Sequence, residues 1–453
     1  MSEVNFRLLF DEDSFVQTLA FIHGDGSEDG HEDCCFTGFG TVGNRLVFAA
    51  VDSGEKRSVV HGSNFAVKAV RSLEAAVQHK VPFIIGFTGS YLDVSGGAGL
   101  LCDFSDLIVS IRRASGKIPL ICVIDGQCFG TFAVIAAMCD FVFLCGGTSA
   151  IAASSDTAVN LASGRIEAAD LLKFDADYSE KNSVIVSGIS SDIEGLRSSI
   201  NDLFRYLPDS VFSGAPSDRS SVSVSGALDS DIAALKGREL AASLCDGGTF
   251  YELSASFGPE AFTGFGQVFG RTVGIIGFDT EQTSGLAGAN AIVKLFRFTD
   301  FCATFRVPAV KLLDFTGVKS TDRDAFKLPG LLSKFIFRNG EKHRSISVVT
   351  GSACGELVPA FILKRRYDAG NLAIAWKGSY IDAINPCAAA LMKFGEDIRN
   401  DPDPAAARKK YIELYKNEFS RAELAAEKGL IDDVIDPSET RLRIASYLSI
   451  LQG

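Results

Sequence analysis

The tripeptide Gly38-Phe39-Gly40 is followed by an apolar run at residues 46–51, and the same arrangement recurs at Gly264-Phe265-Gly266, before an apolar run at 272–278. The two tripeptides are 226 residues apart (264 − 38). One such match could arise by chance, but further matches follow in the same chain order at similar offsets. These are 9–11 with 244–246, Val81-Pro82 with Val307-Pro308, Phe87-Thr88-Gly89 with Phe315-Thr316-Gly317, and 126–130 with 351–355. We conclude that the chain contains two copies of one domain.

A stretch at residues 206–230 separates the two copies. It is rich in Ser, Asp and Gly and has few periodic apolar residues, a composition typical of a surface linker. We therefore expect an N-terminal domain at 1–230, which ends in this linker, and a C-terminal domain at 231–453. Each copy is long enough to form a core of its own.

Within each copy, short apolar runs alternate with segments of helical periodicity. In the first copy the run at 46–51 is typical of a strand, and Ala66, Val70 and Leu73 then share one face of a helix. Nearly continuous apolar strands such as 120–124 indicate sheets that are covered on both faces. The alternation of strands and helices predicts an α/β fold for each domain.

The strongest local signals are two loops, one in each copy, that join a strand to a helix. We expect strand, loop and helix at 120–124, 125–131 and 132–139 in the first copy, and at 346–350, 351–356 and 357–366 in the second. A glycine-containing loop of this kind exposes backbone N–H groups beside the positive end of the helix dipole. Such donors suit an anion or a developing oxyanion, whereas the simpler alternative is a tight turn without a ligand. Equivalent loops in both copies favour a reaction with two ligands.

The overall charge and the cysteine content restrict the function. With 44 basic and 56 acidic residues the net charge is −12, which disfavours non-specific binding to nucleic acid. The 11 cysteines include no C-x-x-C pair, and residues 1–10 lack the apolar run of a signal peptide. The most apolar stretch, 118–138, carries Asp125 and Gln127, so a buried strand and helix fit it better than a membrane span. We therefore expect a cytoplasmic protein with reduced thiols.

Other catalytic motifs fit poorly. Residues 38–43 satisfy the dinucleotide-binding pattern G-x-G-x-x-G, but they precede a strand instead of following one. The 5 histidines form no metal-binding pattern, and the sequence has neither a Walker lysine loop nor a G-x-S-x-G elbow. Cys128 and Cys354 lie in the two repeated loops. Each is either a nucleophile or, more simply, a small buried thiol.

Several segments resemble one known family, and together they cover nearly the whole chain. Arg7-Leu8-Leu9, the run Gly-Arg-Thr-Val-Gly-Ile-Ile-Gly at 270–277 and Asp314-Phe315-Thr316-Gly317 are each similar to a motif of that family. The most specific match is the closing run Gly-Leu-Ile-Asp-Asp-Val-Ile-Asp-Pro at 429–437. The chain thus resembles the carboxyltransferase subunit of biotin-dependent acyl-CoA carboxylases and decarboxylases, of the propionyl-CoA carboxylase beta and methylmalonyl-CoA decarboxylase alpha type.

This resemblance implies two tandem domains of the crotonase (ClpP/crotonase) type, related by internal duplication, in an oligomer built from dimers, often a hexamer. It places the acyl-CoA against the first domain and carboxybiotin against the second domain of a neighbouring subunit. The positions that match the family then take these roles: catalytic oxyanion loops at Gly130, Thr131, Gly355, Glu356 and Leu357; acyl-CoA binding at Gly89, Ser90, Gly96, Gly97, Ala98, Gly126, Gln127, Cys128 and Phe129; biotin binding at Asp314, Phe315, Thr316, Gly317, Ala353 and Cys354. The resemblance implies no metal site.

The implied reaction moves CO₂ between carboxybiotin and the α carbon of a short acyl-CoA, of the acetyl, propionyl or methylmalonyl type. An α-proton of acyl-CoA leaves only when the enolate is stabilised, and losing one N–H donor from such a site costs about 10²–10³ in rate. The first loop would hold the thioester oxygen and the second the ureido oxygen of biotin. Both enolates would then lie in backbone oxyanion holes, and no protein base is required.

The resemblance also implies partners. The chain would need a separate biotin carboxyl carrier protein, together with either a biotin carboxylase or a membrane sodium-pump decarboxylase subunit, according to the direction of the reaction. Two alternatives stay open: a non-catalytic assembly subunit that kept the paired fold, and a biotin-independent CoA hydratase or isomerase of the crotonase type. The chain departs from the family at Thr131 and Glu356, where the family has glycine, and at Pro359, where it often has a substrate-selecting aspartate.

Overall fold

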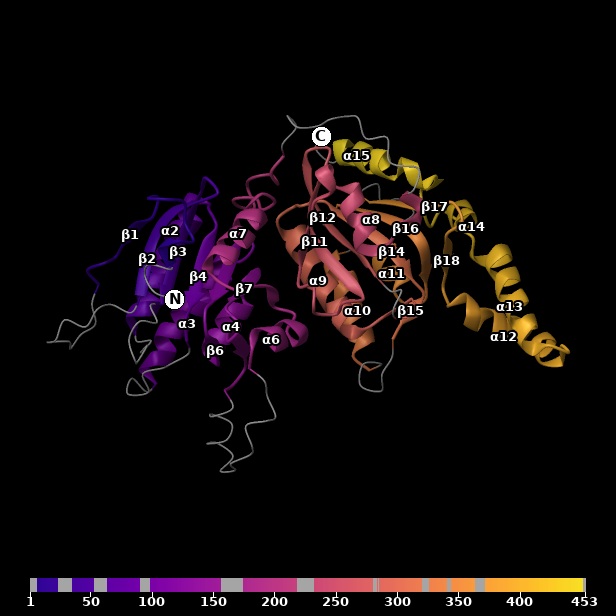
Figure 1. Ribbon diagram of the computed structural model, residues 1–453, viewed down its shortest axis with the longest axis horizontal. Coiled ribbons are helices and arrows are strands. Elements are labelled where there is room, and N and C mark those ends of the chain that lie inside the picture. The colour runs from indigo at the N-terminus through magenta and orange to yellow at the C-terminus, as the bar shows by residue number, and fades with distance from the viewer. Residues whose placement is uncertain are drawn as a thin grey trace, which may run out of the picture. The chain divides into compact units, whose positions relative to one another are not determined.

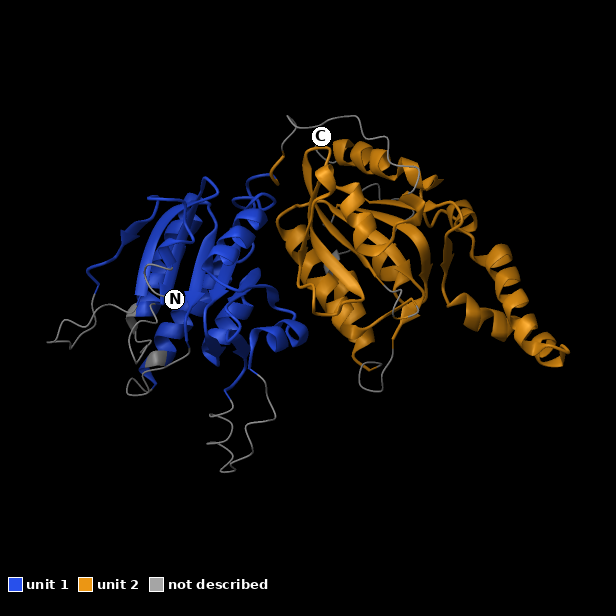
Figure 2. Ribbon diagram, viewed as in Figure 1, with its two compact units in different colours: residues 1–214 blue, residues 215–453 orange. Residues whose placement is uncertain are grey.

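The computed structural model describes residues 6–22, 35–52, 63–89, 98–155, 174–217, 232–279, 283, 285–319, 326–339, 344–362 and 371–450. The chain divides into two compact units, 1–214 and 215–453, which we call unit 1 and unit 2 (Figure 2). Each unit has its own sheet and its own cluster of buried apolar side chains.

Unit 1 is built around a seven-stranded sheet with the order β1-β2-β3-β4-β5-β7-β9 (Figure 1). The first three strands pair antiparallel and the others pair parallel. Strands β5 and β7 are buried along their whole length, as the sequence predicts for strands covered on both faces. The described elements are β1 (Val16–Thr18), β2 (Cys35–Val42), β3 (Arg45–Asp52), α2 (Ser63–His79), β4 (Phe83–Phe87), α3 (Gly99–Ala114), β5 (Leu120–Ile124), β6 (Gln127–Phe129), α4 (Thr131–Ala137), β7 (Phe141–Cys145), β8 (Ala150–Ala152), α6 (Ala176–Asn182), β9 (Val186–Ser190) and α7 (Ile193–Phe204).

Unit 2 repeats this plan with the order β10-β11-β12-β14-β16-β17-β19, and β18 also pairs with β16 (Figure 1). Its strands are β10 (Phe250–Leu253), β11 (Ala261–Val268), β12 (Arg271–Phe278), β13 (Leu286–Ala287), β14 (Ala309–Phe315), β15 (Gly317–Val318), β16 (Ser345–Cys354), β17 (Leu372–Trp376), β18 (Tyr380–Asp382) and β19 (Asp433–Ile435). Its α-helices are α8 (Gly237–Leu244), α9 (Ala289–Thr304), α10 (Leu328–Asn339), α11 (Val358–Phe361), α12 (Pro386–Asn400), α13 (Pro404–Tyr415), α14 (Ala422–Glu427) and α15 (Thr440–Ile450); short turns are η2 (Ile232–Ala234), η3 (Asp246–Gly248), η5 (Lys416–Ser420) and η6 (Pro437–Glu439).

The repeated Gly-Phe-Gly tripeptide lies in the antiparallel part of each sheet, where neighbouring atoms come too close for a side chain. A Cβ atom at Gly38 would stand 2.3 Å from the carbonyl oxygen of Val16 in β1. A Cβ atom at Gly264 would stand 2.1 Å from the carbonyl oxygen of Tyr251 in β10. Because only glycine permits this approach, the G-x-G-x-x-G pattern is explained by strand packing.

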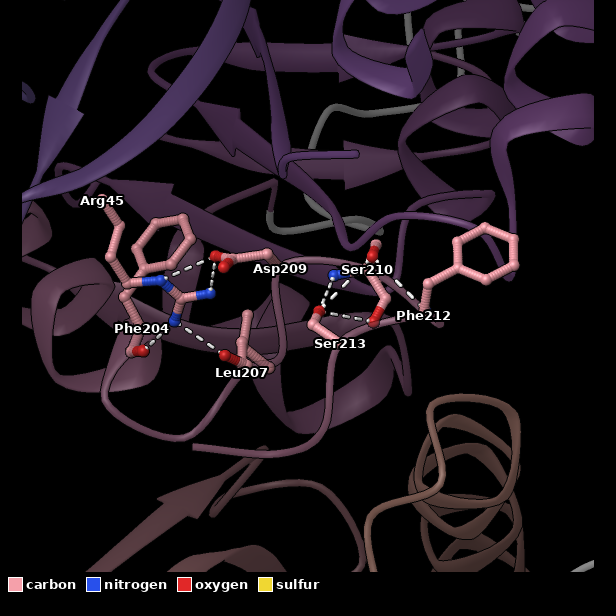
Figure 3. Close-up of polar contacts among 7 residues, drawn as sticks. All are labelled: Arg45, Phe204, Leu207, Asp209, Ser210, Phe212 and Ser213. Atoms are coloured by element: carbon pink, nitrogen blue, oxygen red, sulfur yellow. Dashed lines mark hydrogen bonds and ion pairs between the residues drawn. The ribbon is translucent and has the colours of Figure 1, made fainter. Parts of the chain in front are cut away.

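Residues 206–213, which the sequence placed in a surface linker, are instead fastened to unit 1 (Figure 3). The Arg45 guanidinium donates to the carbonyl oxygen of Leu207 at 2.7 Å and pairs with the Asp209 carboxylate. The Leu207 side chain is fully buried, and the two units divide only at 214–215. Bonds from one distant arginine thus hold this polar surface segment against unit 1.

In the part of the chain that the structure describes, no helix is both long enough and apolar enough to cross a membrane. The apolar stretch at 118–138 forms β5, β6 and α4 of unit 1. The prediction of a buried strand and helix in this stretch is therefore confirmed.

Candidate active site

The first predicted loop connects β5 to α4 through the short strand β6, which pairs in parallel with β8. The Gly130 amide continues this ladder, since it donates to the carbonyl oxygen of Ala153 at 3.2 Å. The chain then turns sharply, because Gly130 has a φ of 61°, a left-handed value that favours glycine. Helix α4 begins at Thr131, whose amide has no acceptor among the described residues. Thr131 therefore presents the first free backbone donor of this loop.

The second loop repeats this arrangement in unit 2. Strand β18 pairs in parallel with the end of β16, and the Gly355 amide extends that ladder with a 3.0 Å bond to the Asp382 carbonyl oxygen. Gly355 also has a left-handed φ, of 88°. Within the described ranges, neither Glu356 nor Leu357 has an acceptor for its amide. In both units, free donors thus follow directly after a glycine whose own amide is bonded.

We call Gly130 with Thr131 the first cradle, and Gly355 with Glu356 and Leu357 the second cradle. The resemblance assigns Gly130 and Gly355 to the oxyanion loops together with Thr131, Glu356 and Leu357. In the structure the amides of both glycines are bonded within β ladders. The available donors are the amides that follow each glycine. The helices are also shorter than predicted, 7 residues for α4 and 4 for α11, so the free amides matter more than a helix dipole.

In each unit, an aspartate carboxylate accepts a backbone hydrogen bond near the cradle. In unit 1, Asp52 accepts a hydrogen bond from the Thr88 amide at 2.6 Å, and a Cβ atom at Gly126 would stand 2.2 Å from the Thr88 carbonyl oxygen. In unit 2, Asp314 accepts a hydrogen bond from the Ser352 amide at 2.8 Å. These contacts hold the ends of β4 and β14 against the loops beside them.

The structure brings some of the other predicted site residues to the cradles. In unit 1, Gln127, Cys128 and Phe129 form β6, next to the first cradle, and Gly89 follows the end of β4. In unit 2, the Cα atom of Gly317 lies 3.4 Å from the position of a Cβ atom at Gly355, so the segment Thr316-Gly317 borders the second cradle. The Asn385 side-chain Nδ2 donates to the Thr316 carbonyl oxygen at 3.2 Å and holds this segment in place.

The remaining predicted residues either lie outside the described residues or are exposed or buried away from the cradles' free amides. Ser90, Gly96 and Gly97 lie outside the described residues, and Ala98 is exposed just before α3. The side chains of Cys128, Phe315, Ala353 and Cys354 are fully buried in the cores, so these residues contribute only backbone to the loops. Burial, with a contribution from the nearby Asp382 charge, raises the pKa of Cys354 to about 12, which fits a structural thiol and not a nucleophile.

A cavity of about 440 Å³ lies beside the second cradle. Its polar groups include Glu356, Asp382 and Lys428, and much of the rest is apolar. The lining residues are Gly355, Glu356, Val358, Pro359, Ile381, Asp382, Ala383, Phe419, Leu424, Ala425, Lys428 and Leu430. The volume is typical of a pocket for a small organic ligand.

No site role was predicted for one part of the lining of this cavity. Phe419, Leu424 and Leu430, which we call the cavity wall, come from the segment between β18 and β19. This segment has no matching motif in the first copy, so the internal repeat gave no signal for it. Leu430 lies in the closing run 429–437 that resembles the family. Phe419 is distinguished only by its exposure, with 42% of its surface accessible, and a sequence does not report exposure.

Comparison with known proteins identifies the family. The family described as "Carboxyl transferase domain" matches residues 3–452 of the chain. The chain belongs to the carboxyl transferase family. This confirms the resemblance inferred from the sequence and the expectation that the chain is an enzyme subunit of this class.

Relatives within the family are distant but cover most of the chain. The methylmalonyl-CoA carboxyltransferase 12S subunit of Propionibacterium freudenreichii subsp. shermanii is 26% identical and aligns with 92% of this chain and 81% of its own length. The methylmalonyl-CoA decarboxylase subunit alpha of Propionigenium modestum is also 26% identical, over 98% of this chain and 89% of its own.

Among solved structures, the transcarboxylase 12S hexamer with hydrolysed methylmalonyl-coenzyme A bound superposes with a TM-score of 0.88. It is 26% identical and covers 99% of this chain and 89% of that one. The predicted fold is therefore confirmed: a crotonase-like carboxyltransferase fold of the α/β class.

Proposed function

We propose that the chain is the carboxyltransferase subunit that moves CO₂ between carboxybiotin and the α carbon of a short acyl-CoA, of the acetyl, propionyl or methylmalonyl type. The observation that carries the proposal is the duplicated cradle, in which a bonded glycine is followed in each unit by amides without an acceptor among the residues that the structure describes. A transfer between two carriers needs charge stabilised on both, and two equivalent donor sites supply this. The names of the relatives support methylmalonyl-CoA and propionyl-CoA chemistry.

In unit 1, the Thr131 amide acts on the acyl-CoA. When the α carbon gains or loses a carboxyl group, negative charge develops on the thioester oxygen, and this N–H donates to it. The amide is held in advance by the β6–β8 ladder on one side and by α4 on the other. A donor that needs no reorganisation stabilises the charge more strongly than water would.

In unit 2, the second cradle and its cavity suit biotin. The amides of Glu356 and Leu357 would hold the ureido oxygen, and the apolar cavity wall would pack against the fused rings. Biotin, when bound, supplies the nitrogen that carries the exchanged carboxyl group. The size and mixed lining of the cavity fit such a ligand, and Glu356, at a position where the family has glycine, lines the same cavity.

The proposed reaction also implies partner proteins, an oligomeric state and a location. We expect biotin to arrive on a separate carrier protein, and the further partner to be a biotin carboxylase or a membrane sodium-pump subunit. The transcarboxylase 12S neighbour is described as a hexamer, which supports a dimer-based hexamer here. A cytoplasmic location fits a subunit that meets soluble acyl-CoA and a mobile carrier.

The test is biotin-dependent release of CO₂ from malonyl-CoA or methylmalonyl-CoA by the purified protein. Release that requires both components supports the proposal. Silence across the short acyl-CoA series would favour a non-catalytic assembly subunit. Turnover of unsaturated acyl-CoA without biotin would favour a hydratase or isomerase.

The donor assignment has its own test in Thr131→Pro. Proline lacks an amide hydrogen but fits the first position of a helix, so the fold is expected to persist. We expect kcat to fall by about 10²–10³, the cost of one oxyanion donor. The control is Thr131→Val, which keeps the amide and changes only the side chain, and which should retain turnover. Equal activity of the two variants would refute the assignment.

A further inference from the structure

Asp382 is the last residue of β18 and makes contacts in two directions. Its carbonyl oxygen accepts the Gly355 amide of the second cradle at 3.0 Å. Its carboxylate accepts the Ser420 hydroxyl at 2.5 Å and the Ile384 amide at 3.3 Å. One residue thus joins the cradle to the helical segment between β18 and β19.

That helical segment contains a π-helical turn at Lys416–Ser420, between α13 and α14. Such a turn inserts one extra residue into a helix and is frequent at functional sites. Here it turns Ser420 inward, where it is fully buried against Asp382, and places Phe419 in the lining of the cavity. The hydrogen bond to Ser420 therefore sets where Phe419 stands.

The duplication provides an internal comparison for Asp382. In unit 1 the matching ladder runs along Ala152 and Ala153, which have no polar side chain. The first cradle forms there with the same bonded glycine. A carboxylate is therefore not needed to build a cradle, so the Asp382 side chain has another role. In unit 2 its carboxylate contacts the segment that carries the cavity wall.

We propose that Asp382 is a positioning residue of the second cradle, which fixes the cavity wall at Phe419 relative to the amides of Glu356 and Leu357. The distance between the donating amides and the apolar wall is then fixed, so a substrate with a ring system can contact both at once. This inference rests on the proposed function, since it assumes that biotin occupies the cavity. Asp382 acts through the wall and the cradle, and touches no reacting atom.

The experiment measures biotin-dependent CO₂ release for Asp382→Ala while biotin and acyl-CoA are varied separately. We expect the KM for biotin to rise about tenfold, because misplacing a binding wall weakens only the ligand that uses it. The KM for acyl-CoA, which binds in unit 1, should stay within a factor of about two. A residue needed only for folding would lower the amount of active enzyme and leave both KM values unchanged.

Two further variants keep the inference testable if Asp382→Ala does not fold. Ser420→Ala removes the hydroxyl on the other side of the bond and should raise the KM for biotin in the same direction. Asp382→Asn keeps an acceptor oxygen for Ser420 and should recover most of the wild-type KM. The matched control is Asp436→Ala, the same change at an exposed carboxylate paired with Lys377, which should leave both KM values unchanged.

The outcomes separate the two proposals. If the wild-type protein shows no biotin-dependent release, the proposed function fails and this inference fails with it. If the wild type is active and both Asp382→Ala and Ser420→Ala keep the wild-type KM for biotin, only the positioning role is overturned. A selective rise in the KM for biotin that Asp382→Asn reverses would support it.

Discussion

At the scale of single residues, Lys311 is the least expected side chain in unit 2. It lies on β14 with only 5% of its surface exposed, and Ala309 and Leu313, on the same face of the strand, are also buried. Among the described residues its side-chain amine forms no hydrogen bond or ion pair. Burial lowers the pKa of this amine to about 8. Below pH 8 the folded protein therefore buries the positive charge of Lys311, which in the unfolded chain would be hydrated.

We expect Lys311→Met to stabilise the protein below pH 8. An unfolded lysine has a pKa near 10.4, so the penalty for burying the charge is on the order of 3 kcal/mol and is fully present below pH 8. As pH rises from 8 to about 10.5, the unfolded chain also loses the proton, and the advantage of methionine should disappear. Urea unfolding followed by the fluorescence of Trp376, the single tryptophan of the chain, measures both effects.

Lys377→Met is the control for this experiment. Lys377 pairs with Asp436 on the surface at 2.8 Å, and about 60% of its side chain is exposed. Removing a surface pair should change the stability by less than about 1 kcal/mol at any pH. A stabilisation by Lys311→Met that did not shrink between pH 8 and 10.5 would show that the buried charge is not its cause.

At the scale of elements, the close approach of β10 to β11 depends on Gly264. A Cβ atom there would stand 2.1 Å from the backbone oxygen of Tyr251, and a backbone atom cannot move aside as a side chain can. We expect Gly264→Ala to destabilise unit 2 by about 1–3 kcal/mol, as overpacking of a tight site does. The same fluorescence measurement reports it, because Trp376 belongs to the sheet of unit 2.

Gly330→Ala is the matched control. Gly330 lies in α10 and a Cβ atom there would meet nothing within 4 Å, so alanine should stabilise the helix by up to about 1 kcal/mol. Equal effects of the two substitutions would mean that general backbone freedom, and not the contact with Tyr251, selects glycine at residue 264.

These elements also show how much of the fold the sequence could predict. The duplication and the α/β alternation were visible because they depend on local apolar patterns and on repeated motifs. Which amides within each cradle are already bonded could not be predicted, because β6 and β18 are only 3 residues long and pair with segments that a local pattern does not reveal. The cavity wall was missed because it comes from a segment outside the repeat.

At the scale of the whole molecule, the proposal distributes one reaction over two units. Thr131 serves the acyl-CoA in unit 1, and Glu356 and Leu357 serve biotin in unit 2. The resemblance to the family implies that the two ligands meet between neighbouring subunits. If so, each active site combines unit 1 of one chain with unit 2 of another, and damage to the two cradles should be separable between chains.

Mixed oligomers test this arrangement. Thr131→Pro removes a donor from the first cradle, and Glu356→Pro removes one from the second, so each variant alone should be nearly inactive. When the two are co-expressed in equal amounts, half of the dimers contain one chain of each kind, and each mixed dimer has one site with both cradles intact. We expect about a quarter of the wild-type rate of biotin-dependent CO₂ release from the mixture. Activity no higher than that of either variant alone would mean that both cradles of a site belong to the same chain.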